Sequence, residues 1–271
     1  MKATILALSL MALLSKDIPG TPAPAENRSG VTASWNKNPV IAHRGAWKKN
    51  HLPENSIASL NEAIRLGCYG SEFDVHMTAD SVLVVNHDAE FYGMPIAKST
   101  YQQLRAKKHP NGEEIPTLEA YLKVGTRQKK TKLILELKPS EISTERDLKM
   151  TDKALAIVKQ LKATPWVDYI SFSYDILKHV RQAQPKANVA YLKGDVGLDK
   201  LKSDGFYGAD YHLSVYQKGE WFEQARSLRL TINAWTVNKA EDMNWLLDNK
   251  ADFITTNEPE LLFDVIRSRG E

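Results

Sequence analysis

The chain has 271 residues, of which 42% are hydrophobic and 25% charged, and its net charge is +3. This composition supplies enough apolar material for one large core, and so mild a positive charge does not indicate nucleic-acid binding. The lone cysteine, Cys68, excludes an internal disulfide and a multi-cysteine metal cluster, and its apolar surroundings predict a packed thiol.

The amino terminus differs in kind from the rest of the chain. Met1-Lys2 precedes an uncharged run at 3–15, which is shorter than the roughly 20 residues that span a bilayer. A run of this length is typical of a secretory signal peptide, and Ala23-Pro24-Ala25 offers a cleavage site of small residues. We therefore predict a signal peptide over 1–25, a linker over 26–38, and an exported protein that is periplasmic or secreted.

From residue 39 onward, short apolar runs alternate with longer segments of helical periodicity. Strands are predicted at 40–42, 71–77, 82–86, 133–138, 169–173, 188–192, 208–212, 231–236 and 253–255. Helices are predicted at 53–67, 101–104, 117–122, 145–162, 174–183, 198–203 and 219–228, followed by two helices that Asn238 and Asn257 would cap.

This alternation predicts a parallel sheet with helices outside it. The nine strands are one more than a closed eightfold barrel needs, and the short turn 78–81 marks the pair that holds the surplus strand. An open doubly wound sheet is the rival architecture, but no Gly-rich fingerprint follows the first strand. We therefore predict one α/β domain over 39–271, a TIM-like (β/α)8 barrel with a small insertion, the weakly patterned excursion at 89–116.

Carboxylates occur inside two of the predicted strands. Glu72 and Asp74 are two residues apart, so their side chains share one face of a strand, and Glu136 and Lys138 repeat this spacing. A carboxylate in an otherwise apolar strand is costly unless it is paired or bound to a metal. In a parallel barrel, chemically active side chains gather at the carboxyl ends of the strands and in the loops after them.

Three of these carboxylates, Glu72, Asp74 and Glu136, would make a hard oxygen site suited to Mg²⁺ or Ca²⁺. Zinc is disfavoured because its sites usually draw on histidine or cysteine. The alternative is that the carboxylates only form ion pairs with Arg44 and Lys138 inside the barrel.

Two histidines lie just after strands. His43 and His87 can act as a general acid and base because imidazole titrates near neutral pH, and the adjacent Arg44 and Asp88 favour catalysis over a structural role. Arg44 offers a planar fork matched to phosphate oxygens, and Lys138 offers a point charge. The other five histidines lack such neighbours, and we assign them no role.

Five motifs, in this order, resemble the series of the glycerophosphodiester phosphodiesterase family, in the superfamily of phosphatidylinositol-phospholipase-C-like phosphodiesterases: His43-Arg44-Gly45, Pro53-Glu54-Asn55, Glu72-x-Asp74, His87-Asp88 and Glu136-Leu137-Lys138. The segments 233–238 and 252–257 also match the family, so the resemblance covers about 39–268. Where family members often have Lys-Asp-Gly after the acidic strand, this chain has Thr78-Ala79-Asp80-Ser81, a departure that concerns the turn more than the chemistry.

The resemblance implies a metal-dependent enzyme that hydrolyses glycerophosphodiesters to glycerol 3-phosphate and an alcohol. By motif, the acid/base pair would be His43 and His87, the metal ligands Glu72, Asp74 and Glu136, the phosphate-binding residues Arg44 and Lys138, and the pocket-lining residue Trp235. Glu54 would be a further ligand or a carboxylate that supports the ligands. The excursion 89–116 falls where the family inserts a variable cap, so substrate specificity does not carry over.

Several alternatives stay open at this level. Either histidine can be the acid, and the nucleophile can be water or the substrate's own glycerol hydroxyl. A related reading is a phosphodiesterase of the lysophospholipase D or sphingomyelinase D type, and a different class is a non-catalytic barrel that binds anions. The expected partner is a small molecule, without nucleic acid and without a stable membrane anchor.

Overall fold

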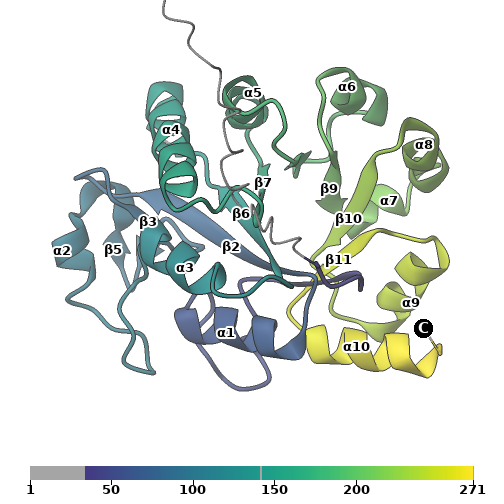
Figure 1. Ribbon diagram of the computed structural model, residues 1–271, viewed down its shortest axis with the longest axis horizontal. Helices are drawn as coiled ribbons and strands as arrows, with labels where there is room; N and C mark the ends of the chain where they lie inside the picture. The colour runs from purple at the N-terminus through teal and green to yellow at the C-terminus, as the bar shows by residue number, and fades with distance from the viewer. Residues whose placement is uncertain (1–33, 141, 271) are drawn as a thin grey trace, which may run out of the picture. The chain divides into compact units, whose positions relative to one another are not determined.

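The computed structural model describes residues 34–140 and 142–270, and its centre is a barrel of parallel strands with helices outside (Figure 1). The strands are β1 (Val40–Ala42), β2 (Gly70–Met77), β3 (Leu83–Val85), β4 (Glu90–Phe91), β5 (Met94–Pro95), β6 (Lys132–Leu137), β7 (Val167–Ser171), β8 (Val189–Tyr191), β9 (Gly208–His212), β10 (Thr231–Trp235) and β11 (Phe253–Thr256). The helices are α1 (Ile57–Leu66), α2 (Tyr101–Leu104), α3 (Leu118–Gly125), α4 (Thr144–Gln160), α5 (Tyr174–Ala183), α6 (Leu198–Ser203), α7 (Leu213–Tyr216), α8 (Trp221–Leu228), α9 (Ala240–Asp248) and α10 (Pro259–Ser268), with a short 3-10 helix, η1, at Ile96–Lys98.

The main sheet closes on itself. Its strands follow the order β1-β11-β10-β9-β8-β7-β6-β2-β3, and β1 also pairs with β2. All pairings within this sheet are parallel except that of β2 with β3, which is antiparallel. The predicted (β/α)8 barrel is therefore confirmed. The surplus strand is β3, on the far side of the predicted turn at 78–81.

Side chains alternate between the inside of the barrel and the helical layer because successive strand residues point to opposite faces. Along β6, Leu133, Leu135 and Leu137 join the large core beneath the helices. Ile134, between them, instead packs in a separate buried cluster with Ile41, Ile170 and Leu192. Polar residues that follow on the inward face therefore emerge above this apolar cluster, at the carboxyl end of the barrel.

The cap segment, residues 89–116, lies beside β3 in Figure 1. It contains the predicted helix α2 and also the hairpin β4–β5, which the weak patterning did not predict. A small apolar cluster of its own holds it together: Val84, Phe91, Ile96, Leu104 and Ile115. The Glu113 carboxylate accepts hydrogen bonds from the backbone N–H groups of Ile57 (2.9 Å) and Ala58 (3.2 Å), which fastens the cap segment to the start of α1.

Two predicted helix caps are wrong. The helix after Asn238 begins with Lys239 as its N-cap, and the last helix begins with Glu258, neither with a side-chain cap bond. Asn238 instead accepts the N–H of Asn257 at 2.9 Å, and Asn257 accepts from the ring of His43. Both amides therefore fix the loop after β11 and are not available to a helix terminus.

The predicted signal peptide and most of the predicted linker lie outside the described residues, so both stay predictions. Residues 34–38 have no regular secondary structure, but Asn36 and Asn38 donate hydrogen bonds to the carbonyls of Cys68 and Gly67. The Cys68 side chain is buried as predicted, and this burial raises the pKa of its thiol. Across 34–140 and 142–270, no helix is long and apolar enough to cross a membrane.

Candidate active site

The turn after β1 brings His43 and Arg44 to the carboxyl end of the barrel. The backbone N–H of His43 donates to the carbonyl of Thr256 at 2.9 Å, so the pairing of β1 with β11 continues to this residue. Gly45 has a φ of +79°, and a Cβ there would lie 2.6 Å from the Cβ of Ser59. Only glycine therefore lets the first turn of α1 pack against this loop.

The helix predicted from Pro53 begins later, at Ile57. The hydroxyl of Ser56 caps it by accepting the N–H of Ser59 at 3.0 Å, which leaves 53–55 as a loop that reaches the site. Asn55 in this loop exchanges two hydrogen bonds with Asp74, one from its amide group at 2.8 Å and one from the Asp74 backbone N–H at 3.0 Å. Asn55 therefore fixes the orientation of the Asp74 carboxylate.

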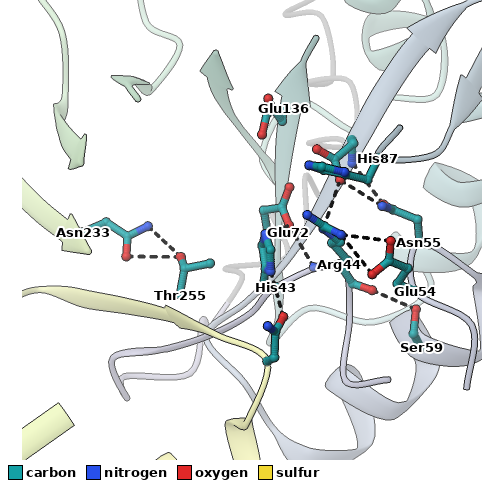
Figure 2. Close-up of polar contacts among 12 residues, drawn as sticks. His43, Arg44, Glu54, Asn55, Ser59, Glu72, His87, Glu136, Asn233 and Thr255 are labelled. Atoms are coloured by element: carbon teal, nitrogen blue, oxygen red, sulfur yellow. Dashed lines mark hydrogen bonds and ion pairs between the residues drawn. The ribbon is translucent and has the colours of Figure 1, made fainter. Parts of the chain in front are cut away.

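Three buried carboxylates meet above the apolar cluster. Glu72 and Asp74 come from β2, and Glu136 lies opposite Asp74 in the register of β6. One oxygen of each side chain lies within 4.8 Å of the others, the spacing that one cation can bridge. Figure 2 shows Glu72 and Glu136 facing the same space as His43 and Arg44. The structure thus brings together the residues that the i, i+2 pattern selected.

The electrostatics of this cluster fit a hard cation. Burial, with added repulsion from Asp74 and Glu136, raises the pKa of Glu72 well above its ordinary value. Burial and Asp74 also raise the pKa of Glu136 to about 8. Glu72 Oε1 is buried and has no hydrogen-bond partner among the described residues. Such oxygens are the ligands that Mg²⁺ and Ca²⁺ prefer, so the three residues fit such an ion.

Two cationic side chains adjoin the carboxylates. Lys138 Nζ lies 3.0 Å from Glu136 Oε1 and 3.3 Å from Asp74 Oδ1. Burial lowers the pKa of Lys138, but the two carboxylates outweigh it and raise this pKa overall, so the ammonium stays charged. Burial alone would raise the pKa of Asp74, yet Lys138 and the other neighbouring groups lower it overall. Asp74 is therefore the carboxylate of the cluster that ionises most readily.

Arg44 is held by three acidic residues. Its Nη1 donates to both oxygens of Glu54, at 2.9 and 3.0 Å, and its backbone N–H donates to Glu72 at 2.8 Å (Figure 2). Its Nε is buried, lies 3.9 Å from Asp74 and has no hydrogen-bond partner within the described parts of the chain. The guanidinium therefore keeps a donor for an anion, while Glu54 orients Arg44 from outside the three-carboxylate cluster.

The two histidines have different partners. His43 Nδ1 lies 2.8 Å from Asn257 Oδ1, and its Nε2 lies 4.0 Å from Glu72. Burial, with a contribution from Arg44, lowers the pKa of His43 to about 4. His87 Nδ1 lies 2.8 Å from a carboxylate oxygen of Asp88. One ring is thus oriented by a neutral amide and the other by a carboxylate.

Sequence reasoning missed residues that orient the site. His76 donates from Nε2 to the carbonyl of His87 at 2.9 Å and so holds the turn that carries His87. The only cue was its place on the same strand face as Asp74. The residue type of Asn257 predicted a helix cap. Its actual partner, His43, lies 214 residues away in the sequence, so no local pattern indicates this contact.

Both histidines, both cationic side chains and two of the three carboxylates open into one cavity of about 120 Å³. Its charged wall contains His43, Arg44, Glu72, His87, Glu136 and Lys138, and its apolar wall contains Ile170, Phe172, Leu192 and Trp235. The Trp235 ring packs edge-on against Phe172, with centroids 5.5 Å apart, and its N–H donates to the carbonyl of Asp210 at 2.8 Å. The cavity therefore offers an apolar surface beside a charged one. These two surfaces suit a small ligand that has a charged ester group and a short carbon chain.

Comparison with known proteins gives consistent matches. Residues 43–261 match the model of the glycerophosphoryl diester phosphodiesterase family. A glycerophosphodiester phosphodiesterase of Caldanaerobacter subterraneus subsp. tengcongensis is 26% identical over 253 residues, covering 86% of this chain and 100% of that protein. The crystal structure of a glycerophosphodiester phosphodiesterase from Parabacteroides distasonis is 41% identical, with a TM-score of 0.84 over 88% of this chain and 100% of the other.

A further solved structure has a similar fold. It is an Oleispira antarctica phosphodiesterase in complex with the product sn-glycerol-3-phosphate, with a TM-score of 0.73 and 23% identity. The match covers 85% of this chain and 97% of that one. At this identity the likeness concerns the fold.

Proposed function

The chain belongs to the glycerophosphoryl diester phosphodiesterase family, and we propose how its own residues perform the reaction. It is a metal-dependent phosphodiesterase that hydrolyses glycerophosphodiesters to glycerol 3-phosphate and an alcohol. The observation that carries the assignment of roles is that His43 and His87 open into the same small cavity as Arg44, Lys138 and two carboxylates of the cluster. Those two are Glu72 and Glu136, and Asp74 lies beside them.

His43 is the base in this proposal. Asn257 Oδ1 accepts a hydrogen bond, so His43 Nδ1 carries the hydrogen and Nε2 presents its lone pair toward the cavity. The attacking hydroxyl, of water or of the substrate's glycerol, gives its proton to this nitrogen as its oxygen bonds to phosphorus. A neutral amide partner suits a ring that begins the reaction uncharged.

His87 is the acid. The Asp88 carboxylate accepts the hydrogen of Nδ1 and orients the ring, so that the protonated imidazole holds its other proton on Nε2 for donation. As the bond from phosphorus to the leaving oxygen breaks, that oxygen takes this proton and departs as the neutral alcohol. With water as the nucleophile, His43 then releases a proton to solvent and His87 takes one up, which restores the enzyme. With the glycerol hydroxyl, water opens the cyclic phosphate in a second step, in which His87 takes the proton of water and His43 returns a proton to the glycerol oxygen.

The remaining charged groups bind the phosphoryl oxygens. Arg44 supplies the buried Nε–H that lacks a partner, and Lys138 supplies an ammonium group above Glu136. Glu72, Asp74 and Glu136 would hold the divalent cation, which draws negative charge from the phosphoryl oxygens when it is bound. We propose Mg²⁺ or Ca²⁺ because the donor set consists of carboxylate oxygens alone. Protein stripped with a chelator and refilled with each ion would identify the active one.

A change of leaving group tests the two histidine roles. His87→Ala is expected to lower kcat on glycerophosphocholine about 10²- to 10⁴-fold, and on the 4-nitrophenyl diester of glycerol 3-phosphate far less, because nitrophenolate leaves without a proton. His43→Ala is expected to lower both rates alike. His179→Ala is the matched control, since that ring lies on α5 and pairs with Asp152. Equal losses on both substrates in His87→Ala would contradict the assignment.

The products separate this reaction from its relatives. Release of glycerol 3-phosphate and free alcohol supports the proposal, whereas lipid phosphate from a lysophospholipid would identify a lysophospholipase D-type enzyme. We also propose export, which rests on the uncharged run at 3–15 and the small residues Ala23-Pro24-Ala25. The mass of the mature protein from a bacterial host would test it, because an uncleaved amino terminus in the cytoplasmic fraction contradicts export.

A further inference from the structure

The catalytic cavity is too small for a whole substrate. Its volume of about 120 Å³ is well below the roughly 300 Å³ at which cavities for drug-sized ligands begin. It has room for the glycerol phosphate half of a diester, packed against Phe172 and Trp235. The alcohol half must therefore extend out of the cavity.

A second cleft, of about 430 Å³, adjoins the catalytic cavity. We call it the cap cleft, because the loop at 51–54 forms one wall and the cap segment forms the other. Two pairs of residues form the boundary between the two spaces. Arg44 faces the catalytic cavity while its partner Glu54 lines the cap cleft, and His87 faces the cavity while its partner Asp88 lines the cleft. A group leaving past His87 thus meets the cap cleft first.

The cap cleft is acidic. Glu54, Asp88 and Glu90 line it, and no lysine or arginine is among the lining residues. Glu54 and Asp88 already pair with Arg44 and His87, whereas the exposed Glu90 carboxylate has no partner among the described residues. The lining therefore carries one free negative charge beside two that are partly compensated.

Aromatic rings cover another side of the cap cleft. Tyr92 is 49% exposed, which is unusual for a large side chain, and Phe91 and His109 pack beneath it. The Tyr92 hydroxyl lies 3.1 Å from His109 Nδ1, and His109, buried to more than nine-tenths, has no hydrogen-bond partner for Nε2 in the described parts of the chain. This places a fixed ring face next to the carboxylates.

The walls of the cap cleft are built in advance. Phe91 belongs to the apolar cluster of the cap segment, and Glu113 ties that segment to α1. The side chain of Asn86 also donates to the backbone carbonyls of Asp88 (2.8 Å) and Glu90 (3.1 Å), which sets the turn that carries both carboxylates. Binding there would therefore cost little ordering.

We propose that the cap cleft binds the alcohol half of the substrate and selects alcohols that carry an ammonium or quaternary ammonium group. A cation over an aromatic face beside a carboxylate gains from both groups, and the low hydration of a quaternary ammonium favours the ring. Glu90 and Tyr92 are the specificity-determining residues. The inference rests on the proposed function, since it concerns the substrate of the same site.

Selectivity is the quantity to measure. Full-length enzyme loaded with its divalent cation is assayed on glycerophosphocholine, whose alcohol is cationic, and on glycerophosphoglycerol, whose alcohol is neutral. The wild type is expected to prefer the choline ester. In Glu90→Gln, the ratio of the two kcat/KM values is expected to fall about 3- to 20-fold, through KM, and Tyr92→Ala should have an effect of similar size.

Controls keep the outcomes distinct. Glu119→Gln removes an exposed carboxylate on α3 that pairs with Lys123 and is not among the residues lining the cap cleft, so it should leave the ratio unchanged. Tetramethylammonium should inhibit the wild type competitively, and less so Glu90→Gln. An enzyme that cleaves both substrates equally well, with a ratio that neither variant changes, overturns the inference alone. An enzyme that cleaves no glycerophosphodiester overturns the proposed function and the inference with it.

Discussion

The barrel contains buried charges at both of its ends, and the two sets are built differently. At the amino-terminal end, Lys132 and Asp168 form an ion pair of 3.0 Å. Asn188 donates to the same carboxylate at 3.1 Å, the lysine also donates to a backbone carbonyl at 2.9 Å, and its ammonium lies 4.9 Å from the ring centre of Trp35. One acid therefore meets one base, and the hydrogen-bonding groups of both are used.

The carboxyl end is unbalanced. Five carboxylates face only two cationic side chains there, Arg44 and Lys138. The five are those of the cluster, Glu54 and Asp210, which lines the same cavity, so three negative charges are in excess if all are ionised. Glu72 Oε1 and Arg44 Nε also lack partners among the described residues. A balanced ion pair needs no ligand, whereas an excess of negative charge favours binding of a divalent cation, and the free donor suits an anion. The contrast argues against the alternative that the carboxylates serve only as ion pairs.

The largest expected effect comes from removing one charge at the carboxyl end. Glu72→Gln should lower kcat on the order of 10³-fold, because it removes a proposed ligand of the cation that would stabilise transition-state charge. Stability should hardly suffer, since the variant loses a buried carboxylate with an unsatisfied oxygen. Mg²⁺ or Ca²⁺ at 100 times its Kd should add about 2.7 kcal/mol to the unfolding free energy of the wild type and so raise its Tm. The Tm of the variant should rise much less. Equal Tm increases in both proteins would contradict the ligand assignment.

The amino-terminal end should respond in the opposite way. Asp168→Ala leaves the Lys132 ammonium buried without its counter-ion, which is expected to cost about 3–5 kcal/mol of unfolding free energy. The kcat of the molecules that remain folded should be unchanged, because no group of the catalytic cavity is touched. Denaturant unfolding and active-site titration measure the two quantities. If the variant does not fold, Asp168→Asn provides a milder version, and a loss of kcat at unchanged stability would refute the purely structural role.

Asp210 sharpens the comparison through a pH-dependent effect, because this acid of the cavity lining is buried without a cationic partner among the described residues. Burial raises its pKa to about 7, against the opposing effect of Asn233. Below about pH 4 the acid is protonated in both the folded and the unfolded states; between there and pH 7 only the unfolded state ionises, so the wild type loses stability as pH rises. Asp210→Asn should therefore match the wild type near pH 4 and exceed its unfolding free energy by up to about 4 kcal/mol at pH 8, because a rise of about three pH units in this pKa corresponds to that amount. Thermal unfolding across this pH range measures the difference, and a constant difference would contradict the raised pKa.

Local patterns carried the fold and most of the site. The strands were predicted because apolar runs alternate with segments of helical periodicity. Glu72, Asp74 and Glu136 were predicted as site residues because a carboxylate in an apolar strand is costly unless it is paired or bound to a metal. The caps of the last two helices failed for a physical cause. Asn238 and Asn257 have the right residue type for a cap, but their hydrogen bonds go to the loop after β11 and to His43.

The cap segment shows the same limit. Its hairpin β4–β5 is only two residues long on each side, too short for strand periodicity to be visible in the sequence. Its position over the loop at 51–54, and hence the cap cleft, depends on Glu113 binding the start of α1, 56 residues earlier in the chain. A bond between such distant residues leaves no local pattern.

By itself, therefore, the sequence determined which residue types stand at the ends of which strands, because strand and helix periodicities are properties of neighbouring residues. Only the tertiary structure decided their partners. Closure of the sheet sets β2 beside β6 and β1 beside β11, which brings Asp74 to Glu136 and Asn257 to His43. The distances, the burial and the raised pKa values of the site arise from that closure, since each depends on groups that the chain separates by tens to hundreds of residues.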